Sequence, residues 1–262
     1  MKHPKDLNEK INYLKFHADM TVWARLADKY AVRGYIKEKG LEDILVPLYG
    51  KWDNSAGLLH DWDRLPEKFV LKTNNGCGTV LIVKDKASID LPALKAKLDY
   101  WLKKKDIGVR TVELHYTLIK PCIIAEGLLE DLSVVTFSRS LIDYKIWCFD
   151  GKPYCCFVAY DREVGGEHHI FDLYDLDWNE HTELMSDKTP RHPLPRPKNW
   201  ERMKAVAATL SAGHPQMRVD LYNIDGKIYF GELTMTSQGG YIDYFTDECL
   251  LEMGRQFEVE KV

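Results

Sequence analysis

The chain has 262 residues, of which 45% are hydrophobic and 29% are charged, proportions typical of a soluble globular protein with one large domain or two smaller ones. Its net charge of −4 gives no reason to expect a nucleic acid or an anionic membrane as a partner. No apolar run approaches the roughly 20 residues that span a bilayer, and the first residues do not resemble a signal peptide, so we expect a cytoplasmic protein without integral membrane contact.

The first forty residues predict two helical stretches. Leu7, Ile11 and Leu14 recur at helical spacing, and Asp19 is a suitable N-cap for a second stretch that Gly40 ends. The basic residues of the segment 29–33 could meet a phosphate, but a solvated face is the more common outcome. A short strand is expected at residues 44–49, followed by a loop at residues 50–57.

A glycine-rich turn then separates two expected strands, residues 69–72 and 80–83. The turn reads Thr73-Asn-Asn-Gly76-Cys-Gly78-Thr79 and directly follows Lys72. Its glycines would let backbone N–H groups approach a polyphosphate, and the lysine would supply a point charge. A strand follows, so the turn is neither a P-loop nor a dinucleotide-binding fingerprint. The alternative is a plain hairpin turn.

An amphipathic helix is expected at residues 92–105, and a buried strand at residues 119–125 that ends in the acidic sequence Glu126-Gly-Leu-Leu-Glu130-Asp131. Such a strand could offer its backbone groups to an adenine ring, while a carboxylate takes the ribose hydroxyls. Most acidic turns after strands are only solvated.

Two more strands, residues 142–148 and 154–160, are expected around an Asp150-Gly151 turn. Lys145 lies within the first, where an inward lysine needs an anionic partner; an edge-strand lysine facing water is the alternative. Residues 163–198 are polar and rich in proline, which indicates an excursion or lid. Asn199 is expected to cap a helix that Gly213 ends.

The sequence from Arg218 to Thr234 predicts two strands joined at Asp225-Gly226, with Asp220 and Glu232 as carboxylates. A two-residue turn would pair Asp220 with Gly231 and put Glu232 on the opposite face. A three-residue loop with a bulge at Gly226 would pair Asp220 with Phe230 and Arg218 with Glu232, so that the polar residues share one face. The first register favours a solvated hairpin, and the second favours a divalent cation with the phosphates that it carries.

The six cysteines form no C-x-x-C pair, and we expect buried free thiols rather than a zinc site. Cys77 is the exception, because it lies in the glycine-rich turn.

Taken in order, these motifs resemble the ATP-grasp superfamily, and most closely its TupA-like branch. The phrases that carry the resemblance are Leu65-Pro66-Glu-Lys-Phe-Val-Leu-Lys72, Asp143-Tyr-Lys145 with Phe149-Asp-Gly151-Lys, Arg218-Val-Asp220-Leu-Tyr222 and Gly231-Glu232-Leu-Thr234. The resemblance covers roughly residues 4–255. It implies an α+β fold in which two α+β subdomains grip ATP between antiparallel sheets after a small, mainly helical N-terminal segment. We accordingly expect a segment over residues 1–64, a glycine-loop subdomain over 65–124 and a metal and acceptor subdomain over 125–262.

The resemblance also implies roles for single residues. Lys72 and Lys145 would contact the phosphates of ATP, Arg218 would stabilise the transferred phosphoryl group, and these three would be the catalytic residues. The loop and the adenine and ribose contacts would come from Asn74, Gly76, Gly78, Thr79, Ile124, Glu126, Gly127, Glu130 and Asp131. Asp220, Glu232 and Thr234 would hold Mg²⁺, and the acceptor would meet Arg162, Gly239 and Gly240. Many relatives have asparagine where this chain has Thr234, which is a shorter and often weaker ligand, although the TupA-like branch shares the threonine.

The implied activity is an ATP- and Mg²⁺-dependent carboxylate–amine ligase that forms an amide through an acyl phosphate. Its substrates would be a uronic-acid carboxylate of a surface polysaccharide and an amino acid or other amine. The alternatives are an ATP-grasp phosphotransferase that acts on a sugar or hydroxyl, and a non-catalytic glycan-binding component of polysaccharide assembly. The sequence does not indicate the oligomeric state.

Overall fold

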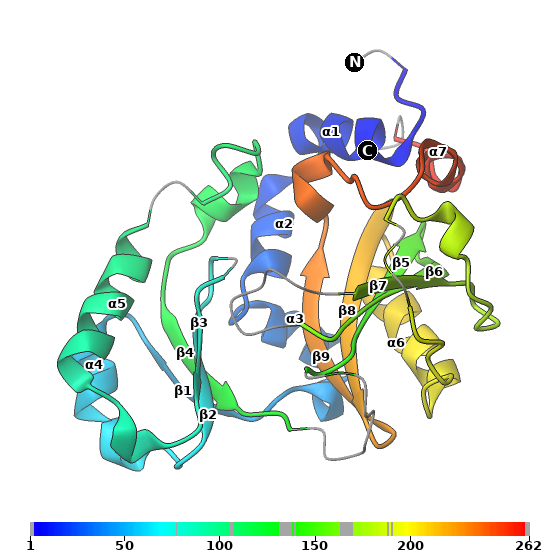
Figure 1. Ribbon diagram of the computed structural model, residues 1–262. Helices are drawn as coiled ribbons and strands as arrows, with labels where there is room; N and C mark the ends of the chain where they lie inside the picture. Colours follow the sequence, from blue (N-terminus) through cyan, green and yellow to red (C-terminus); the bar gives the residue numbers. More distant parts are fainter. Residues whose placement is uncertain are drawn as a thin grey trace. The chain divides into compact units, whose positions relative to one another are not determined.

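The computed structural model (Figure 1) describes residues 3–76, 78–104, 107–130, 138, 140–162, 170–187, 189 and 191–259. The chain forms two compact units. Unit 1 comprises Met1–Ala18, Lys39–Ile44 and Glu130–Val262, and unit 2 comprises Asp19–Glu38 and Leu45–Leu129. In the described ranges, no helix has both the length and the apolar character needed to cross a membrane.

Unit 2 contains a four-stranded antiparallel sheet in the order β1-β4-β2-β3, formed by β1 (Leu48–Trp52), β2 (Phe69–Thr73), β3 (Val80–Val83) and β4 (Ile123–Gly127). The helices α4 (Ser55–His60) and α5 (Leu91–Lys103) lie on the same side of this sheet in Figure 1. The core between them includes Leu58, Phe69, Leu98 and Ile123, all fully buried. α5 is amphipathic as expected, and Asp90 caps its first turn by accepting a hydrogen bond from the Ala93 N–H.

Unit 2 also contains α2 (Met20–Ala27) and α3 (Val32–Glu38). α2 begins at the expected N-cap Asp19, whose side chain accepts from the N–H groups of Thr21 and Val22. The helical prediction for residues 19–40 is therefore confirmed, with a break between the two helices.

Two strand predictions in unit 2 were displaced, in both cases near a proline. Residues 42–44 form a 3-10 turn, and β1 begins only after Pro47. β4 likewise begins after Pro121, several residues into the segment where a strand was expected. Proline lacks the N–H that a paired strand needs, so pairing starts beyond it. The loop expected at residues 50–57 was wrong at both ends, because β1 continues to Trp52 and Asn54 caps α4 through the Gly57 N–H.

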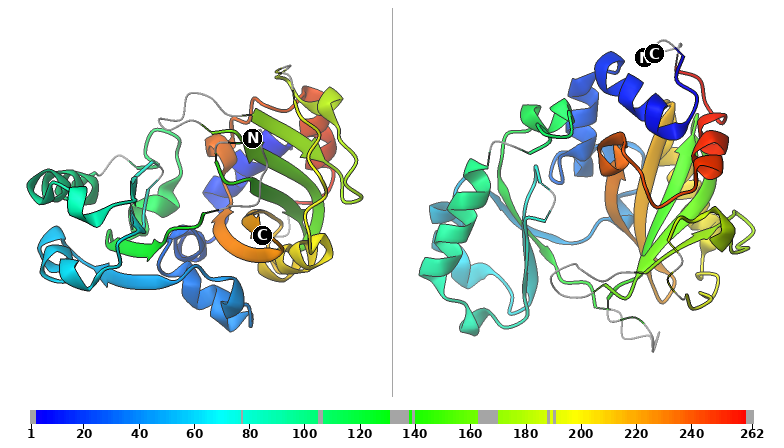
Figure 2. Two further views of the ribbon diagram at one scale, coloured as in Figure 1. Left: turned by 60° about the horizontal axis from the view of Figure 1, so that its bottom comes forward. Right: turned by 45° about the horizontal axis from the view of Figure 1, so that its top comes forward.

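Unit 1 contains a five-stranded antiparallel sheet in the order β7-β6-β5-β8-β9. Its strands are β5 (Asp143–Phe149), β6 (Lys152–Tyr160), β7 (Ile170–Tyr174), β8 (Gln216–Ile224) and β9 (Lys227–Thr234). Figures 1 and 2 show α6 (Trp200–Ser211) against one face of this sheet. α1 (Leu7–His17) and α7 (Asp247–Gly254) lie side by side at one end.

β7 was not expected, because residues 163–198 were interpreted as a loop-rich excursion. Residues 170–174 instead pair with β6 from Cys156 to Tyr160. Asn199 does precede α6, but it has a φ of 61° and makes no capping hydrogen bond; its amide donates to the Gly226 carbonyl of the β8–β9 turn. The cap prediction was therefore right in position and wrong in mechanism.

The β8–β9 hairpin follows neither of the two expected registers. Its turn is the two-residue one, with Ile224 paired to Lys227 and both Asp225 and Gly226 at positive φ. A bulge at Gly231 then shifts the pairing, so that Asp220 lies opposite Glu232 and Arg218 opposite Thr234. A side chain at Gly231 would begin 2.9 Å from the Asp220 carbonyl oxygen. The bulge thus brings Arg218, Asp220, Glu232 and Thr234 to one face, although the turn itself has only two residues.

Candidate active site

Charged residues meet on one face of the unit 1 sheet, where β5 and β8 are neighbours. Lys145 pairs with Asp220, and Asp143 pairs with Tyr222 two positions along. Because alternate residues of a strand share a face, the register aligns these side chains with Arg218 and, through the bulge, with Glu232. We call Asp143, Lys145, Arg218, Asp220 and Glu232 the charge cluster.

Lys145 bridges the two aspartates of the charge cluster. Its ammonium lies 2.5 Å from Asp143 Oδ2 and 2.6 Å from Asp220 Oδ2, and its side chain is only 11% exposed. β5 is the central strand of the sheet. The inward interpretation of this lysine is confirmed, and the edge-strand alternative is wrong.

Arg218 forms a fork on Asp220. Its Nε and Nη2 lie 2.7 Å from Asp220 Oδ1 and Oδ2 respectively. Nη2 also donates to Glu232 Oε1 and to Thr234 Oγ1, both at 3.1 Å, and Nη1 donates to Ser237 Oγ at 2.8 Å. The guanidinium therefore fixes the positions of both predicted metal-binding carboxylates.

Burial and charge act in opposite directions on these groups. Burial disfavours ionised Asp220, but Arg218 and Lys145 outweigh it and lower the pKa of Asp220 to about 2. Burial also opposes the charge of Lys145, whose pKa is nevertheless raised by Asp143 and Asp220. For Asp143, burial prevails over Lys145 and raises the pKa. The cations and Asp220 therefore remain charged at neutral pH.

The donor set suits a magnesium ion that arrives with phosphates. Asp220 and Glu232 supply two carboxylates, Thr234 supplies a hydroxyl, and the Glu232 side chain is 47% exposed. Over the described ranges, no three His, Cys, Asp or Glu side chains group closely enough to hold a metal by themselves. Mg²⁺ is commonly held by one or two carboxylates together with substrate phosphates. These residues thus fit Mg²⁺ bound with a polyphosphate.

The residues predicted to meet an acceptor lie on the same unit. Arg162 Nη2 is 3.5 Å from Asp143 Oδ2, with the arginine side chain half exposed. Gly239 and Gly240 belong to a turn that α1 holds, because Lys15 Nζ donates to the Gly239 carbonyl and Asn12 Nδ2 to the Gly240 carbonyl. The N-terminal helix therefore supports this turn, which the sequence did not indicate.

We expect Gly240→Ala to destabilise the protein. Gly240 has a φ of +80°, and an added Cβ would lie 2.9 Å from Asn12 Nδ2. Gly213 is the matched control, since its φ is +87° but nothing lies within 4 Å of an added Cβ. In urea unfolding, Gly213→Ala should lower the free energy of unfolding by the cost of backbone strain alone, roughly 1–2 kcal/mol. Gly240→Ala should lower it by at least roughly 1 kcal/mol more. Equal losses would show that contact with Asn12 does not constrain the turn.

In unit 2, Lys72 is held by an ion-pair chain. Its Nζ lies 2.9 Å from Glu126 Oε2, and Arg33 Nη1 lies 3.0 Å from Glu126 Oε1. Arg33 Nη2 also donates to the Val46 carbonyl at 2.7 Å. Glu126 thus points along the sheet face towards Lys72, and Arg33 holds it there.

Most backbone groups of the predicted adenine segment pair with neighbouring strands of the unit 2 sheet. β4 lies between β1 and β2, Ile124 is fully buried, and the Gly127 N–H donates to the Pro47 carbonyl. β4 ends at Gly127, so residues 128–130 lie beyond the strand. Asp131 lies outside the described residues.

The glycine loop is anchored at its first residues. The Asn74 amide donates to Asp28 Oδ2 and to the Lys120 carbonyl, and its Oδ1 accepts from the Cys122 N–H. The Thr79 hydroxyl accepts from Thr73 at 2.6 Å. Both side chains fix the base of the loop, and their nucleotide contacts stay a prediction. Gly78 has a φ of +74° with open space around it, whereas Cys77 lies outside the described residues. The five described cysteines are free and buried, as expected.

Lys29 and Arg33, for which a solvated face was the more common expectation, both have partners in unit 2. Lys29 Nζ lies 2.7 Å from the Gly76 carbonyl, so its ammonium is at the glycine loop. The solvated face expected for this segment was wrong. The partners lie 47 and 93 residues further along the chain, a separation that no local pattern reveals.

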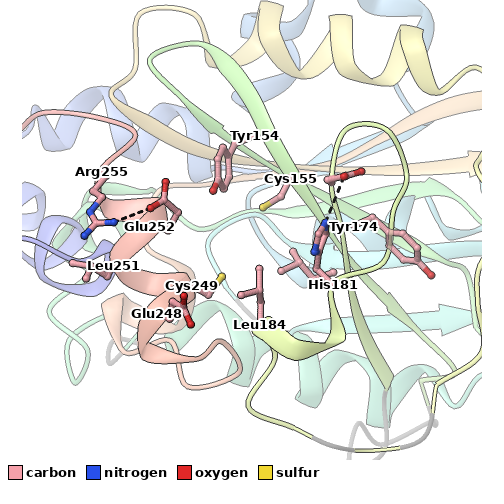
Figure 3. Close-up of a pocket in the computed structure, with 12 residues that line it drawn as sticks. Tyr154, Cys155, Tyr174, His181, Leu184, Glu248, Cys249, Leu251, Glu252 and Arg255 are labelled. Carbon is pink, nitrogen blue, oxygen red and sulfur yellow. Dashed lines mark hydrogen bonds and ion pairs between the residues drawn. The ribbon is translucent and has the colours of Figure 1, made fainter.

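Unit 1 also contains a cavity of about 520 Å³ between the β6–β7 region and α7. Tyr154, Cys155 and Cys249 are among its lining residues (Figure 3). None of the nucleotide, metal or acceptor residues predicted from the sequence lines it. The charge cluster is therefore not part of this cavity.

Comparisons with known proteins agree with the fold. The model of the TupA-like ATPgrasp family matches residues 9–258, and no curated protein matches the sequence. Among solved structures, a D-alanine–D-alanine ligase from Bacillus anthracis complexed with ATP is 15% identical with a TM-score of 0.51, covering 96% of this chain and 74% of that one.

Two further structures have lower TM-scores. A D-alanine–D-alanine ligase from Helicobacter pylori is 15% identical with a TM-score of 0.47, covering 97% of this chain and 67% of its own. N5-carboxyaminoimidazole ribonucleotide synthetase from Thermus thermophilus is 14% identical with a TM-score of 0.49, and the match covers 87% of this chain and 51% of that one. The chain thus spans between half and three quarters of these enzymes. At such identities the Bacillus structure supports the fold alone.

Proposed function

Because the chain belongs to the TupA-like ATP-grasp family, we propose that it is an ATP- and Mg²⁺-dependent carboxylate–amine ligase. The observation that carries the proposal is the charge cluster, in which two buried cations and three carboxylates meet on one sheet face. A cluster of paired charges of this kind can exchange its internal ion pairs for a metal and phosphates without leaving a charge uncompensated.

Each residue has a definite task in this proposal. Asp220 and Glu232, with Thr234, hold the magnesium, which neutralises phosphate charge. Lys145 and Arg218 bind phosphate oxygens and stabilise the charge that spreads over the transferring phosphoryl group. In unit 2, Lys72 contacts the phosphates beside the glycine loop. The ammonium of Lys29, at the Gly76 carbonyl, is a further phosphate contact suggested by its position.

The reaction proceeds in two transfers. The γ-phosphoryl group of ATP passes to an acceptor carboxylate, which gives an acyl phosphate and ADP. An amine then attacks the acyl carbon, loses a proton and expels phosphate, which leaves an amide. Arg162 and the Gly239-Gly240 turn bind the acceptor. By analogy with the family branch, the acceptor is a uronic-acid carboxylate of a surface polysaccharide, and the amine is an amino acid or amino alcohol.

The test is product analysis with the purified protein, ATP, Mg²⁺, pooled uronic acids and pooled amino acids. We expect ADP release over many turnovers to require both the carboxylate and the amine, and a product mass equal to their sum less one water. ADP release that continues over many turnovers without the amine, together with a sugar phosphorylated on a hydroxyl, would replace the ligase by a phosphotransferase. A protein whose melting temperature is unchanged by Mg²⁺ and ATP would instead be a binding component.

A further inference from the structure

The contacts of Lys145 raise a question about how the metal reaches Asp220. The Lys145 ammonium lies 2.6 Å from Asp220 Oδ2, the same oxygen that accepts from Arg218 Nη2. Asp220 Oδ1 accepts from Arg218 Nε. Both oxygens of this carboxylate are therefore engaged by cationic donors, and the Asp220 side chain is only 2% exposed.

A divalent cation bound to Asp220 would come close to that ammonium. Like charges at such short range repel strongly at a buried position, where solvent screens them little. The metal and the ammonium therefore compete for one carboxylate oxygen. Arg218 competes less directly with the metal, because its hydrogen bonds to Asp220 Oδ1 and to the Ser237 hydroxyl do not involve Oδ2.

Asp143 gives the ammonium a second place to go. It lies two residues before Lys145 on the same face of β5, and its Oδ2 is already 2.5 Å from Lys145 Nζ. Its buried Oδ1 has no hydrogen-bond partner among the described residues. Asp143 can thus keep the displaced ammonium paired with a carboxylate, and the Lys145 side chain needs to move only a short distance.

We propose that the Lys145 ammonium holds the metal's place on Asp220 until magnesium arrives with the nucleotide, and that Asp143 then retains the displaced ammonium beside the phosphates. Asp143 is in this sense a positioning residue. The inference rests on the proposed function, because it needs a metal–nucleotide complex. Its consequence is an order of binding: the metal alone binds weakly, and the metal–nucleotide complex binds well because phosphates accept the ammonium that the metal displaces.

The test measures Mn²⁺ binding by electron paramagnetic resonance in the intact protein, with and without a non-hydrolysable ATP analogue. For Mn²⁺ alone, we expect Lys145→Gln to bind at least tenfold more tightly than wild type. Lys145→Arg keeps a cation and should bind as weakly as wild type. Lys152→Gln, at an exposed lysine of the same sheet, should leave the affinity unchanged.

The analogue provides a second and independent readout. It should raise the Mn²⁺ affinity of wild type, and raise that of Lys145→Gln far less. Asp143→Asn should weaken binding of the Mn²⁺–analogue complex at least tenfold, because the displaced ammonium loses its counter-ion. This second variant tests the inference even if Lys145→Gln does not fold.

Failure of the inference and failure of the proposed function are distinguishable. If wild type binds the Mn²⁺–analogue complex but folded Lys145→Gln binds Mn²⁺ alone no better than wild type, Lys145 is only a structural clamp between β5 and β8. The same conclusion follows if Asp143→Asn binds the complex like wild type. If wild type binds neither Mn²⁺ nor the analogue, the proposed function itself is wrong.

Discussion

Asp220→Asn should reduce Mg²⁺-dependent ATP turnover by at least roughly 10²–10³-fold, a loss typical of removing one preorganised electrostatic group from an active site. The substitution keeps the size of the side chain but removes the charge that Arg218 and Lys145 share and that would bind the metal. The measurement is ADP release under saturating ATP and Mg²⁺. Turnover within threefold of wild type would contradict the metal role of Asp220.

Two companion variants separate catalysis from folding. Asp225 lies at the exposed turn of the same hairpin with a φ of 50°, which asparagine tolerates well. The control variant Asp225→Asn should therefore keep full turnover. Glu232→Gln should lose turnover like Asp220→Asn while melting near wild type, because its side chain is half exposed. Asp220→Asn itself leaves Arg218 and Lys145 with one fewer buried counter-ion, so a lower melting temperature is expected.

Lys72→Met should weaken ATP binding at least roughly tenfold, because a charge-assisted contact to a phosphate contributes about 1.5–3 kcal/mol. The fold should survive, since Arg33 still compensates Glu126 at 3.0 Å when the lysine is gone. Isothermal titration with the non-hydrolysable ATP analogue measures the effect. Lys68→Met, at an exposed lysine just before the same strand, is the matched control and should bind like wild type. If both variants bind equally well, Lys72 has no phosphate contact.

Much of the fold could be predicted from local patterns. The spacing of Leu7, Ile11 and Leu14 predicted α1, and the glycine turn between two apolar runs predicted the β2–β3 hairpin. The order of motifs indicated the family that the comparisons confirm over residues 9–258. Each of these signals lies in the local sequence, either within a few neighbouring residues or in the order of several short motifs.

The remaining features depend on contacts that no short segment contains. The register of the β8–β9 hairpin is set by a bulge at Gly231, which reads in sequence like any strand glycine. β7 is short and flanked by polar residues, so its pairing with β6 had no local signal. Arg33 is a polar residue in a short helix, and only its contact with Glu126 in the folded unit shows that it holds the partner of Lys72.

The most direct test of the account is a crystal structure with Mg²⁺ and a non-hydrolysable ATP analogue bound. We predict a magnesium ion about 2.0–2.1 Å from carboxylate oxygens of both Asp220 and Glu232, with the ammonium of Lys145 on a phosphate oxygen. A nucleotide bound elsewhere, such as in the cavity of about 520 Å³ beside α7, with the ion pairs of the charge cluster unchanged, would contradict it.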